Sequence, residues 1–358
     1  MKLKFSLRAL CAAVLLALPA YAASADTKVV AGIPTAFAPY MSGIVYAKAM
    51  GFFKDEGLDV EFISVQGSGV LIPQIVNKAV TFGAIVPDLP TVAMGKGEPY
   101  PIRFFYNAYP KYLFEFVVLE DSPIKSLADL KGKKLGVGAL TFGNIPLSRA
   151  MLQQSGVTWM KDVEVLPVGV GPAAWKRLTD KEIDVLNLFA NQHEVMEVTG
   201  IKIRRLPLPE GFDKLFSNGW IAHEDTIKEN PELVEKFGRA YAKGNLACSF
   251  DVEKCLKAWW LFDPASRPAK DKEAEWIKTN LPTVKVDVRA ATSTQPKGKW
   301  GIYDEASWKQ YLHGMKVGEQ IPDENLDLSK LYTNGFIEKI NAFNPADVKA
   351  RVDHFKVE

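Results

Sequence analysis

The sequence predicts an α/β protein of two lobes with a ligand cleft between them and a helical C-terminal region. Its 358 residues exceed what a single hydrophobic core usually fills, so we expect two bodies. Short apolar runs alternate with amphipathic stretches in two separate units, which is typical of mostly parallel sheets with helices on both faces. An extended, aromatic-rich segment at 103–119, with Pro110 in its middle, separates the units and indicates a crossover.

The N-terminal segment is typical of a secretory signal peptide. Three basic residues precede a short apolar run at 10–18, and small residues at 20–25 offer cleavage after Ala22 or after Ala25. We therefore expect residues 1–25 to be removed and the mature protein to lie in the periplasm. No later stretch is long and apolar enough to suggest a transmembrane helix.

The first alternating unit predicts lobe 1, which begins with residues 26–110. The loops IPTAFAPY, QGSG and PDLP each follow a predicted strand and lead into a helical stretch. Strands are expected at 28–33, 58–65 and 82–86, and helices at 40–50 and 70–77.

The second unit predicts lobe 2 at residues 111–220. A short helix is expected after Ser126, a residue type that suits the N-cap position. Strands are expected at 134–137, 163–167 and 183–189, and helices at 146–154 and after the loop GVGP.

Residues 221–358 are expected to return to lobe 1 and to continue as a helical region. The segment SNGWIAHED at 217–225 suits the return crossing. Residues 281–301 are richer in Pro, Gly and Thr, which predicts a loop with one short strand. Helices are expected at 231–245, 253–262, 272–279, 305–314 and 336–342.

The glycine-rich segment at 133–148, KKLGVGALTFGNIPLS, has the outline of a nucleotide loop but lacks its chemistry. A Walker loop needs Gly-Lys-Ser/Thr, whereas Asn144 follows Gly143 here. A dinucleotide fingerprint needs a third glycine at the position of Thr141. We therefore expect no nucleotide site. Thr141 and Asn144 remain candidates for ligand contact, because small polar residues at a helix start present hydrogen-bonding groups.

Composition and motifs exclude several function classes. A net charge of +2 without a basic stripe gives no case for nucleic acid. The four histidines are isolated, and no G-x-S-x-G motif is present. Asp88 either caps the following helix or hydrogen-bonds a ligand, and His193 either faces the ligand or caps and packs. We therefore expect no enzyme, no metal and no cofactor.

Aromatic side chains gather in and beside the predicted cleft loops. They either staple helix starts or line a pocket for a small organic molecule, and we favour the pocket because these rings lie outside the predicted strands and helices. The cleft loops contain no arginine, which argues against a pure salt-bridge site for an anion, although Arg149 and Arg177 lie one turn into helices and could still reach the ligand. The ring-rich loops favour an aromatic or heteroaromatic ligand, with a carboxylate or sulfonate held by backbone N–H groups and hydroxyls among the candidates. The residues are Phe37, Tyr40, Phe142, Trp175, Phe189 and Trp220, with Tyr106, Asn107 and Tyr109 in the crossover.

Two cysteines remain once the signal peptide is removed. Cys248 and Cys255 lie seven positions apart, and an oxidising compartment favours a structural disulfide over two buried thiols.

Five segments, in combination, resemble a known family. They are YAKAMGFFKDEGLDVEF, VQGSG, TFGAIVPDLP, SPIKSLADLKGKKLGVG and ENPELVEKFGRAYAKG. Together they resemble the ABC-transporter solute-binding proteins of the nitrate, sulfonate and taurine class, the SsuA/THI5-like or NMT1 family. The resemblance covers about residues 28–245.

This resemblance implies a type II periplasmic binding protein fold and a ligand between the lobes. It implies first-lobe contacts from Thr35, Phe37, Gly67, Ser68 and Asp88, and second-lobe contacts from Thr141, Phe142, Asn144 and Asn191. The residues themselves add Tyr40, Tyr109, His193 and Trp220. The implied partners are a membrane permease with its ATPase, served by a monomeric binding protein. Taurine, an alkanesulfonate or nitrate are the alternative ligands, and a pyrimidine-precursor enzyme or a sensory binding protein are the alternative functions.

Overall fold

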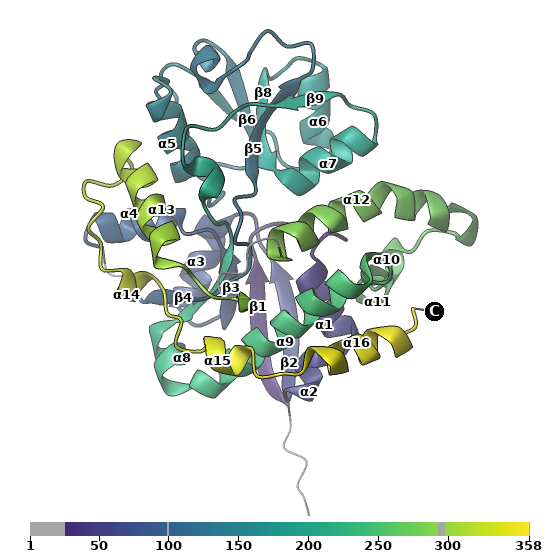
Figure 1. Cartoon of the computed structure of the whole chain (residues 1–358). Helices are drawn as coiled ribbons and strands as arrows, with labels where there is room; N and C mark the ends of the chain where they lie inside the picture. Colours follow the sequence, from purple (N-terminus) through teal and green to yellow (C-terminus); the bar gives the residue numbers. More distant parts are fainter. Residues whose placement is uncertain (1–25, 99, 293–297, 358) are drawn as a thin grey trace, which may run out of the picture.

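The computed structural model describes residues 26–98, 100–292 and 298–357. Two five-stranded sheets, each flanked by helices, form two lobes, with lobe 2 at the top of Figure 1. The expected signal peptide at 1–25 lies outside the described residues. Within the described chain, no helix is long and apolar enough to cross a membrane.

The sheet of lobe 1 has the strand order β2-β1-β3-β10-β4. The strands β1 (Thr27–Ile33), β2 (Leu58–Ser64) and β3 (Phe82–Ile85) are parallel, as the apolar runs predicted. The strand β10 (Gly219–His223) runs antiparallel between β3 and β4 (Ile102–Asn107). Gly219 and Trp220 therefore belong to the first sheet, whereas the sequence assigned them to lobe 2.

The sheet of lobe 2 has the order β7-β6-β8-β5-β9. The strand β6 (Lys134–Val137) is parallel to β7 (Glu164–Pro167) and β8 (Val185–Phe189), while β5 (Phe114–Leu119) is antiparallel to β8 and β9 (Ile203–Arg205). All five residues of β8 are buried, as expected for a central strand. The sequence missed β9, since three residues at a sheet edge carry little periodic signal.

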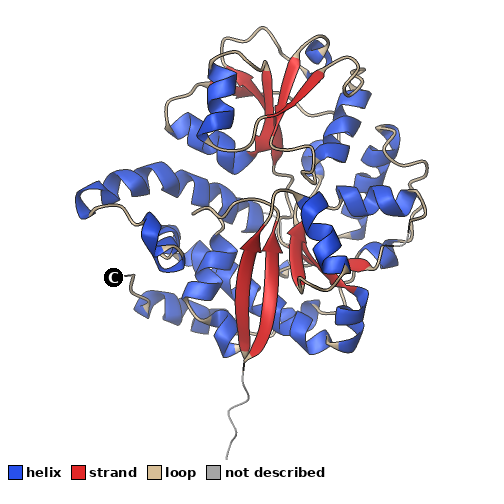
Figure 2. Ribbon diagram, turned by 180° about the vertical axis from the view of Figure 1, so that it is seen from behind, coloured by secondary structure: helices blue, strands red, loops and turns tan. Residues whose placement is uncertain are grey.

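Helices cover both faces of each sheet (Figure 2). In lobe 1 they are α1 (Ser42–Ala49), α2 (Phe52–Asp55), α3 (Ser68–Val76) and α4 (Asp88–Gly95). In lobe 2 they are the short 3₁₀ helix η1 (Leu127–Leu130), α5 (Ile145–Gln154), α6 (Pro172–Thr179) and α7 (Ala190–Val198). The predicted N-cap Ser126 forms a capping box with Asp129.

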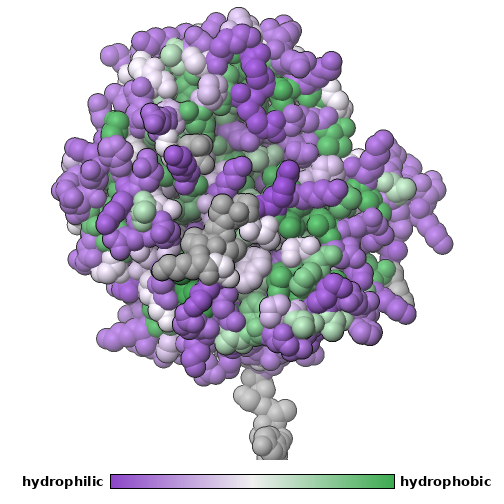
Figure 3. Space-filling view, in the orientation of Figure 1, coloured by the Kyte–Doolittle hydropathy of each residue, from purple (hydrophilic) through white to green (hydrophobic). Residues whose placement is uncertain are grey.

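The C-terminal region is helical, as predicted, and returns over lobe 1 (Figure 1). Its α-helices are α8 (Glu224–Glu229), α9 (Pro231–Phe250), α10 (Val252–Lys257), α11 (Trp259–Phe262), α12 (Glu273–Thr292), α13 (Glu305–Val317), α14 (Leu328–Leu331), α15 (Ile337–Ile340) and α16 (Pro345–His354). Hydrophilic side chains dominate the face seen in Figure 3, while the apolar ones form a continuous core within.

The loop predicted at 281–301 is wrong for residues 281–292, and its residues 293–297 lie outside the described part of the chain. Helix α12 continues through Pro282 to Thr292. Proline usually ends a helix because it removes a backbone hydrogen bond. Here α12 packs against α7 of lobe 2 and against α9 and α10, and buries Thr283, Val284 and Val288. Tertiary packing therefore outweighs the local cost of the proline.

Two chain segments cross between the lobes and pair with each other. The amides of Ala108 and Tyr109 both donate to the Asn218 carbonyl at 3.1 Å. The Ser217 amide donates to the Tyr109 carbonyl at 2.9 Å. The connection is thus a short two-stranded ribbon, a suitable hinge for movement of one lobe against the other.

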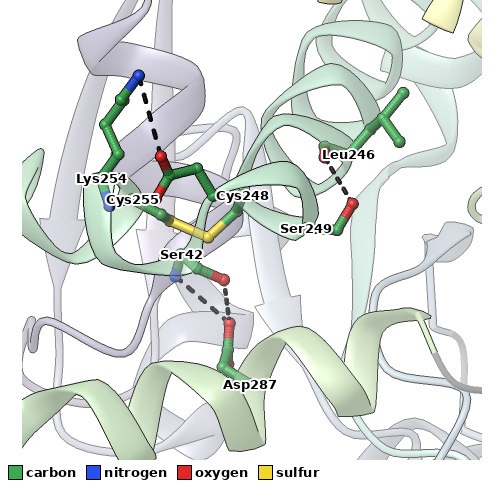
Figure 4. Close-up of a disulfide and its surroundings, with 8 residues drawn as sticks. Ser42, Leu246, Cys248, Ser249, Lys254, Cys255 and Asp287 are labelled. Atoms are coloured by element: carbon green, nitrogen blue, oxygen red, sulfur yellow. Dashed lines mark hydrogen bonds and ion pairs between the residues drawn. A yellow bond between two sulfur atoms is a disulfide. The ribbon is translucent and has the colours of Figure 1, made fainter. Parts of the chain in front are cut away.

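The two cysteines form a disulfide. Cys248, near the end of α9, is joined to Cys255 of α10, with their Cα atoms 5.1 Å apart (Figure 4). Both residues are buried. The bond fixes the turn between the two helices, beside α1 and α12.

We expect the double variant Cys248→Ala/Cys255→Ala to unfold more easily. A disulfide that closes so short a loop removes unfolded-state entropy worth about 2–3 kcal/mol. Urea unfolding should show a loss of that size, and reduction of the native protein with a thiol should reproduce it. An unchanged urea midpoint in both experiments would contradict this role.

Candidate ligand-binding site between the lobes

A cavity of about 100 Å³ lies where the two lobes meet. Because roughly 10–15 Å³ accommodates one water, it has room for several waters or the core of a small organic ligand. Most of its wall is apolar. The lining residues of lobe 1 and the C-terminal region are Ile33, Pro34, Thr35, Tyr40, Met41, Ile44, Gly67, Ser68, Ala84, Val86, Ala108, Tyr109, Asn218, Trp220, Tyr241 and Asp287, and those of lobe 2 are Leu113, Phe114, Phe142, Gly143, Phe189 and Asn191.

Aromatic rings from both lobes meet around this cavity. The rings of Tyr40 in lobe 1 and Phe189 in lobe 2 have centroids 5.8 Å apart, and Phe114 lies 6.1 Å from Phe189. On the floor, Trp220 and Tyr241 meet edge to face at 5.4 Å. Such walls suit a flat organic molecule, which would contact rings of both lobes at once.

One acidic group, Asp287 of α12, lies in the cavity wall. Its Oδ2 accepts hydrogen bonds from the Ser42 hydroxyl at 2.5 Å and the Ser42 amide at 3.3 Å, as Figure 4 shows. Its Oδ1 accepts one from the Tyr109 hydroxyl at 2.7 Å. Burial raises the pKa of Asp287 to about 6, despite these three donors.

Hydrogen bonds across the seam hold the lobes together. The Gly69 amide of lobe 1 donates to the Thr141 carbonyl of lobe 2 at 3.1 Å. The Thr141 hydroxyl donates back to the Gln66 carbonyl at 2.9 Å. The Leu147 amide of α5 donates to Asp88 Oδ2 at 2.8 Å. The structure is thus a closed arrangement in which both lobes enclose the cavity.

Gly143 is a point of close approach between the lobes. A Cβ atom there would lie 2.5 Å from the Ser68 hydroxyl oxygen and inside van der Waals distance of Val86, both in lobe 1. The glycine-rich segment around it therefore serves the fit of lobe 2 against lobe 1.

Comparison with known families decides the identity of the chain. A family model described as NMT1/THI5 like matches residues 38–249, which is more than half of the sequence. The chain belongs to the NMT1/THI5-like family. This confirms the resemblance inferred from the five sequence segments.

Two curated relatives illustrate the range of this family. The riboflavin-binding protein RibY of Chloroflexus aurantiacus is 25% identical over 208 residues, 58% of this chain and 57% of that protein. The 4-amino-5-hydroxymethyl-2-methylpyrimidine phosphate synthase THI11 of Saccharomyces cerevisiae is 26% identical over 238 residues, 62% and 66% of the respective chains. The match therefore spans less than two thirds of either relative.

Solved structures share the fold over most of the chain. The alkanesulfonate-binding protein SsuA of Xanthomonas axonopodis pv. citri, bound to MOPS, has 13% identity and a TM-score of 0.63, covering 87% of this chain and all of that one. The nitrate-binding protein NrtA of Synechocystis PCC 6803 has 14% identity and a TM-score of 0.58, covering 92% and 99%. This NMT1/THI5-like protein therefore has the type II periplasmic binding protein fold that the sequence predicted.

Many of the site residues expected from the sequence come together at the cavity of this NMT1/THI5-like protein. Most of them lie in strand-to-helix loops, in the first turns of helices or in the crossing segments, and Trp220 lies on strand β10. They are Thr35, Tyr40, Gly67, Ser68, Tyr109, Phe142, Asn191 and Trp220.

Other expected residues lie outside the cavity wall. Phe37 packs edge to face on Phe262 at 5.3 Å. Thr141 is exposed on the seam, where it bonds lobe 1. Asn144 is buried in lobe 2, where its amide donates to Ser148 and Asn187. The rings of Trp175 and Tyr106 and the amide of Asn107 are also absent from the described lining.

Asp88 and His193 are buried and bonded to protein groups. Asp88 accepts from the Leu147 amide and the Tyr311 hydroxyl, so it caps α5 of the opposite lobe, although it also begins α4. Burial raises its pKa to about 7. His193 Nδ1 lies 2.9 Å from Glu115 Oε2, and burial lowers the pKa of this histidine.

The sequence reasoning missed Asp287, Tyr241, Phe114 and Asn218. Asp287 fell in the segment expected to be a loop. The buried positions 283, 284, 287, 288, 290 and 291 have helical spacing, which could have identified one face of α12. Pro282 obscured that signal.

At three helix starts near the cavity or the seam, one backbone N–H is bonded within the protein. The Ser42 amide of α1 donates to Asp287, and the Leu147 amide of α5 donates to Asp88. The amide of Gly171, which caps α6, donates to Gln192 Oε1 at 2.8 Å. These three N–H groups are therefore not free to hold a carboxylate or sulfonate.

Proposed function

We propose that this NMT1/THI5-like protein is the periplasmic solute-binding component of an ABC importer that captures a small aromatic ligand by lobe closure. The observation that carries the proposal is the cavity enclosed by rings of both lobes, to which Tyr40 and Phe189, in contact with each other at 5.8 Å, both contribute. A ligand in such a site contacts both lobes in the closed form only, so it stabilises closure by its differential affinity.

The geometry suggests how capture proceeds. In an open form, the crossing ribbon at 108–109 and 217–218 would swing the lobes apart and expose both ring walls. Ligand binding to one wall would then recruit the other, and the seam bonds at Thr141 and Asp88 would form on closure. The closed surface presented to a membrane permease would thus differ from the open one, which makes delivery conditional on a bound ligand.

The comparisons support a transport role but do not identify the ligand or the membrane partners. One similar structure is named as the ligand-binding component of an ABC-type import system from Staphylococcus aureus, with 9% identity, a TM-score of 0.59, and coverage of 89% of this chain and all of that one. The predicted signal peptide and the predicted permease and ATPase partners agree with such a role.

We expect Tyr40→Leu to weaken ligand binding at least tenfold. The substitution removes a ring from the cavity wall and its contact with Phe189, and the loss of one aromatic wall is worth about 1.4 kcal/mol or more. Native mass spectrometry of the purified protein would identify the bound compound, and calorimetric titration would then compare variants.

Tyr46→Leu is the matched control for this experiment. Tyr46 belongs to α1, is buried, and packs on Phe355 away from the cavity. It should lower thermal stability but leave affinity within about twofold. If a broad set of aromatic compounds neither co-purified nor raised the melting temperature, the proposal would be refuted.

An enzyme on the same scaffold is the second candidate, because the yeast relative is named a synthase. The same mass spectrometry distinguishes the two functions. A transport protein returns its ligand with unchanged mass after incubation, whereas an enzyme returns a product of different mass.

A further inference from the structure

The cavity wall contains an acidic side chain and no basic one among the described lining residues. Among the described lining residues, Asp287 carries the one carboxyl group, and lysine, arginine and histidine are absent. The other polar groups in the wall are hydroxyls and amides, such as Ser68, Asn191 and Asn218. An anionic ligand would therefore lie beside a buried carboxyl group, with no basic side chain in the described wall to compensate its own charge.

Asp287 also lacks an ionic partner within the described chain. Its three hydrogen-bond donors are the amide and hydroxyl of Ser42 and the hydroxyl of Tyr109, all uncharged. A carboxylate has about four lone-pair sites, so it has capacity for a further donor. A buried charge of this kind is favourable when a partner of opposite charge or a strong donor completes it.

The titratable groups that face Asp287 do not supply a positive charge to balance its carboxyl group. Tyr40, Tyr109 and Tyr241 surround it, and burial raises the pKa of each phenol, so all three stay neutral at physiological pH. They act as dipoles and cannot neutralise a carboxylate.

The aromatic rings of the wall also favour a positively charged ligand. The faces of aromatic rings carry partial negative charge and attract cations. The rings that line the cavity, including Phe114, Phe142 and Trp220, therefore add to the preference set by Asp287.

We propose that the ligand is an aromatic or heteroaromatic compound with a cationic or hydrogen-bond-donating head that binds Asp287, and that anionic analogues are rejected. This inference rests on the proposed function and narrows it. It replaces the carboxylates and sulfonates expected from the sequence with amines, amidines or N–H-rich heterocycles. Asp287 then has two roles, because it also caps the first turn of α1 through Ser42.

A charge series on one ring system tests the inference. The probes are tryptamine, tryptophol and indole-3-acetate, with phenethylamine, 2-phenylethanol and phenylacetate as the single-ring set. Calorimetric titration of ligand-free protein should show each amine binding at least tenfold more tightly than the matching acid, with the alcohol between them.

The variant Asp287→Asn separates ligand recognition from capping. The amide keeps an acceptor oxygen for Ser42 but loses the charge. We expect amine affinity to fall at least tenfold while alcohol affinity stays within about threefold. A purely structural role would weaken all three head groups equally, which would overturn the inference. The selectivity of the native protein tests it even if this variant does not fold.

The two possible failures differ in their results. If the acids bind as well as the amines, the charge inference is wrong while aromatic solute binding stands. If none of the six probes binds the native protein, the proposed aromatic site itself fails.

Discussion

Replacing Gly143 with alanine is expected to weaken ligand binding by roughly 10- to 100-fold. The added methyl group would meet the Ser68 hydroxyl and Val86 of the opposite lobe, so the lobes could not close fully. Overpacking of a tight interface costs about 1–3 kcal/mol, and each 1.4 kcal/mol is a tenfold change in affinity. Gly143 is absent from the glycines with positive φ, so alanine fits the local backbone and lobe 2 should fold normally.

The control for this prediction is Gly335→Ala. A Cβ at Gly335 has one neighbour, the Thr333 hydroxyl at 3.3 Å, and meets no residue of lobe 2. It should bind ligand like the native protein. Small-angle X-ray scattering with saturating ligand should show a larger radius of gyration for Gly143→Ala alone. Equal affinity and equal radius in both variants would show that closure does not depend on this contact.

Replacing Asp88 with asparagine is expected to become more stabilising as the pH rises, by roughly 2–3 kcal/mol between pH 5 and pH 8. Burial raises the pKa of Asp88 to about 7, above its unfolded value of about 4. The native state therefore binds this proton more tightly than the unfolded chain does. Its stabilising contribution is complete below pH 4 and is lost as the pH rises through 7.

The neighbours of Asp88 do not reverse this loss of stability with rising pH. Tyr311 and Tyr112 face it, and burial keeps the pKa of both phenols well above the ordinary value. An amide preserves the bond from Leu147 because its oxygen still accepts. His193 acts in the opposite direction, since its lowered pKa removes stability at acidic pH. The measurement is therefore the difference in urea unfolding between variant and native protein from pH 5 to 8.

Asp121→Asn serves as the reference substitution, because Asp121 is exposed on lobe 2. Its stability difference from the native protein should stay small and flat across the same range. A flat difference for Asp88→Asn as well would contradict the assignment of a raised pKa to Asp88.

The strands and the general position of the site followed from local pattern. Apolar runs such as 58–65 predict buried strands, and ligands bind where such strands end. Tyr40 and Ser68 follow predicted strands, so this rule identifies them as candidate ligand contacts. The same rule placed Asp88 and His193 at the site, but their partners come from distant elements. Tyr311 and Glu115 are more than 75 positions away from them, and only the folded chain brings these pairs together.

Asp287 shows why the rest could not be inferred. Its role depends on the continuation of α12 past Pro282, and that continuation depends on packing against α7 and α9. Local propensity favours a break at that proline. The residue that sets the charge of the cavity is therefore specified by long-range contacts.

Helix α12 has a consequence for how specificity could change within the family. It presents Asp287 to the cavity, and its Thr283 carbonyl accepts a hydrogen bond from Asn191 of lobe 2 at 3.1 Å. The residue that selects ligand charge and the carbonyl that bonds lobe 2 thus belong to the same helix. This helix has twenty residues and belongs to neither sheet. Substitutions confined to α12 could therefore give related proteins different ligands while the hinge and both sheets stay the same.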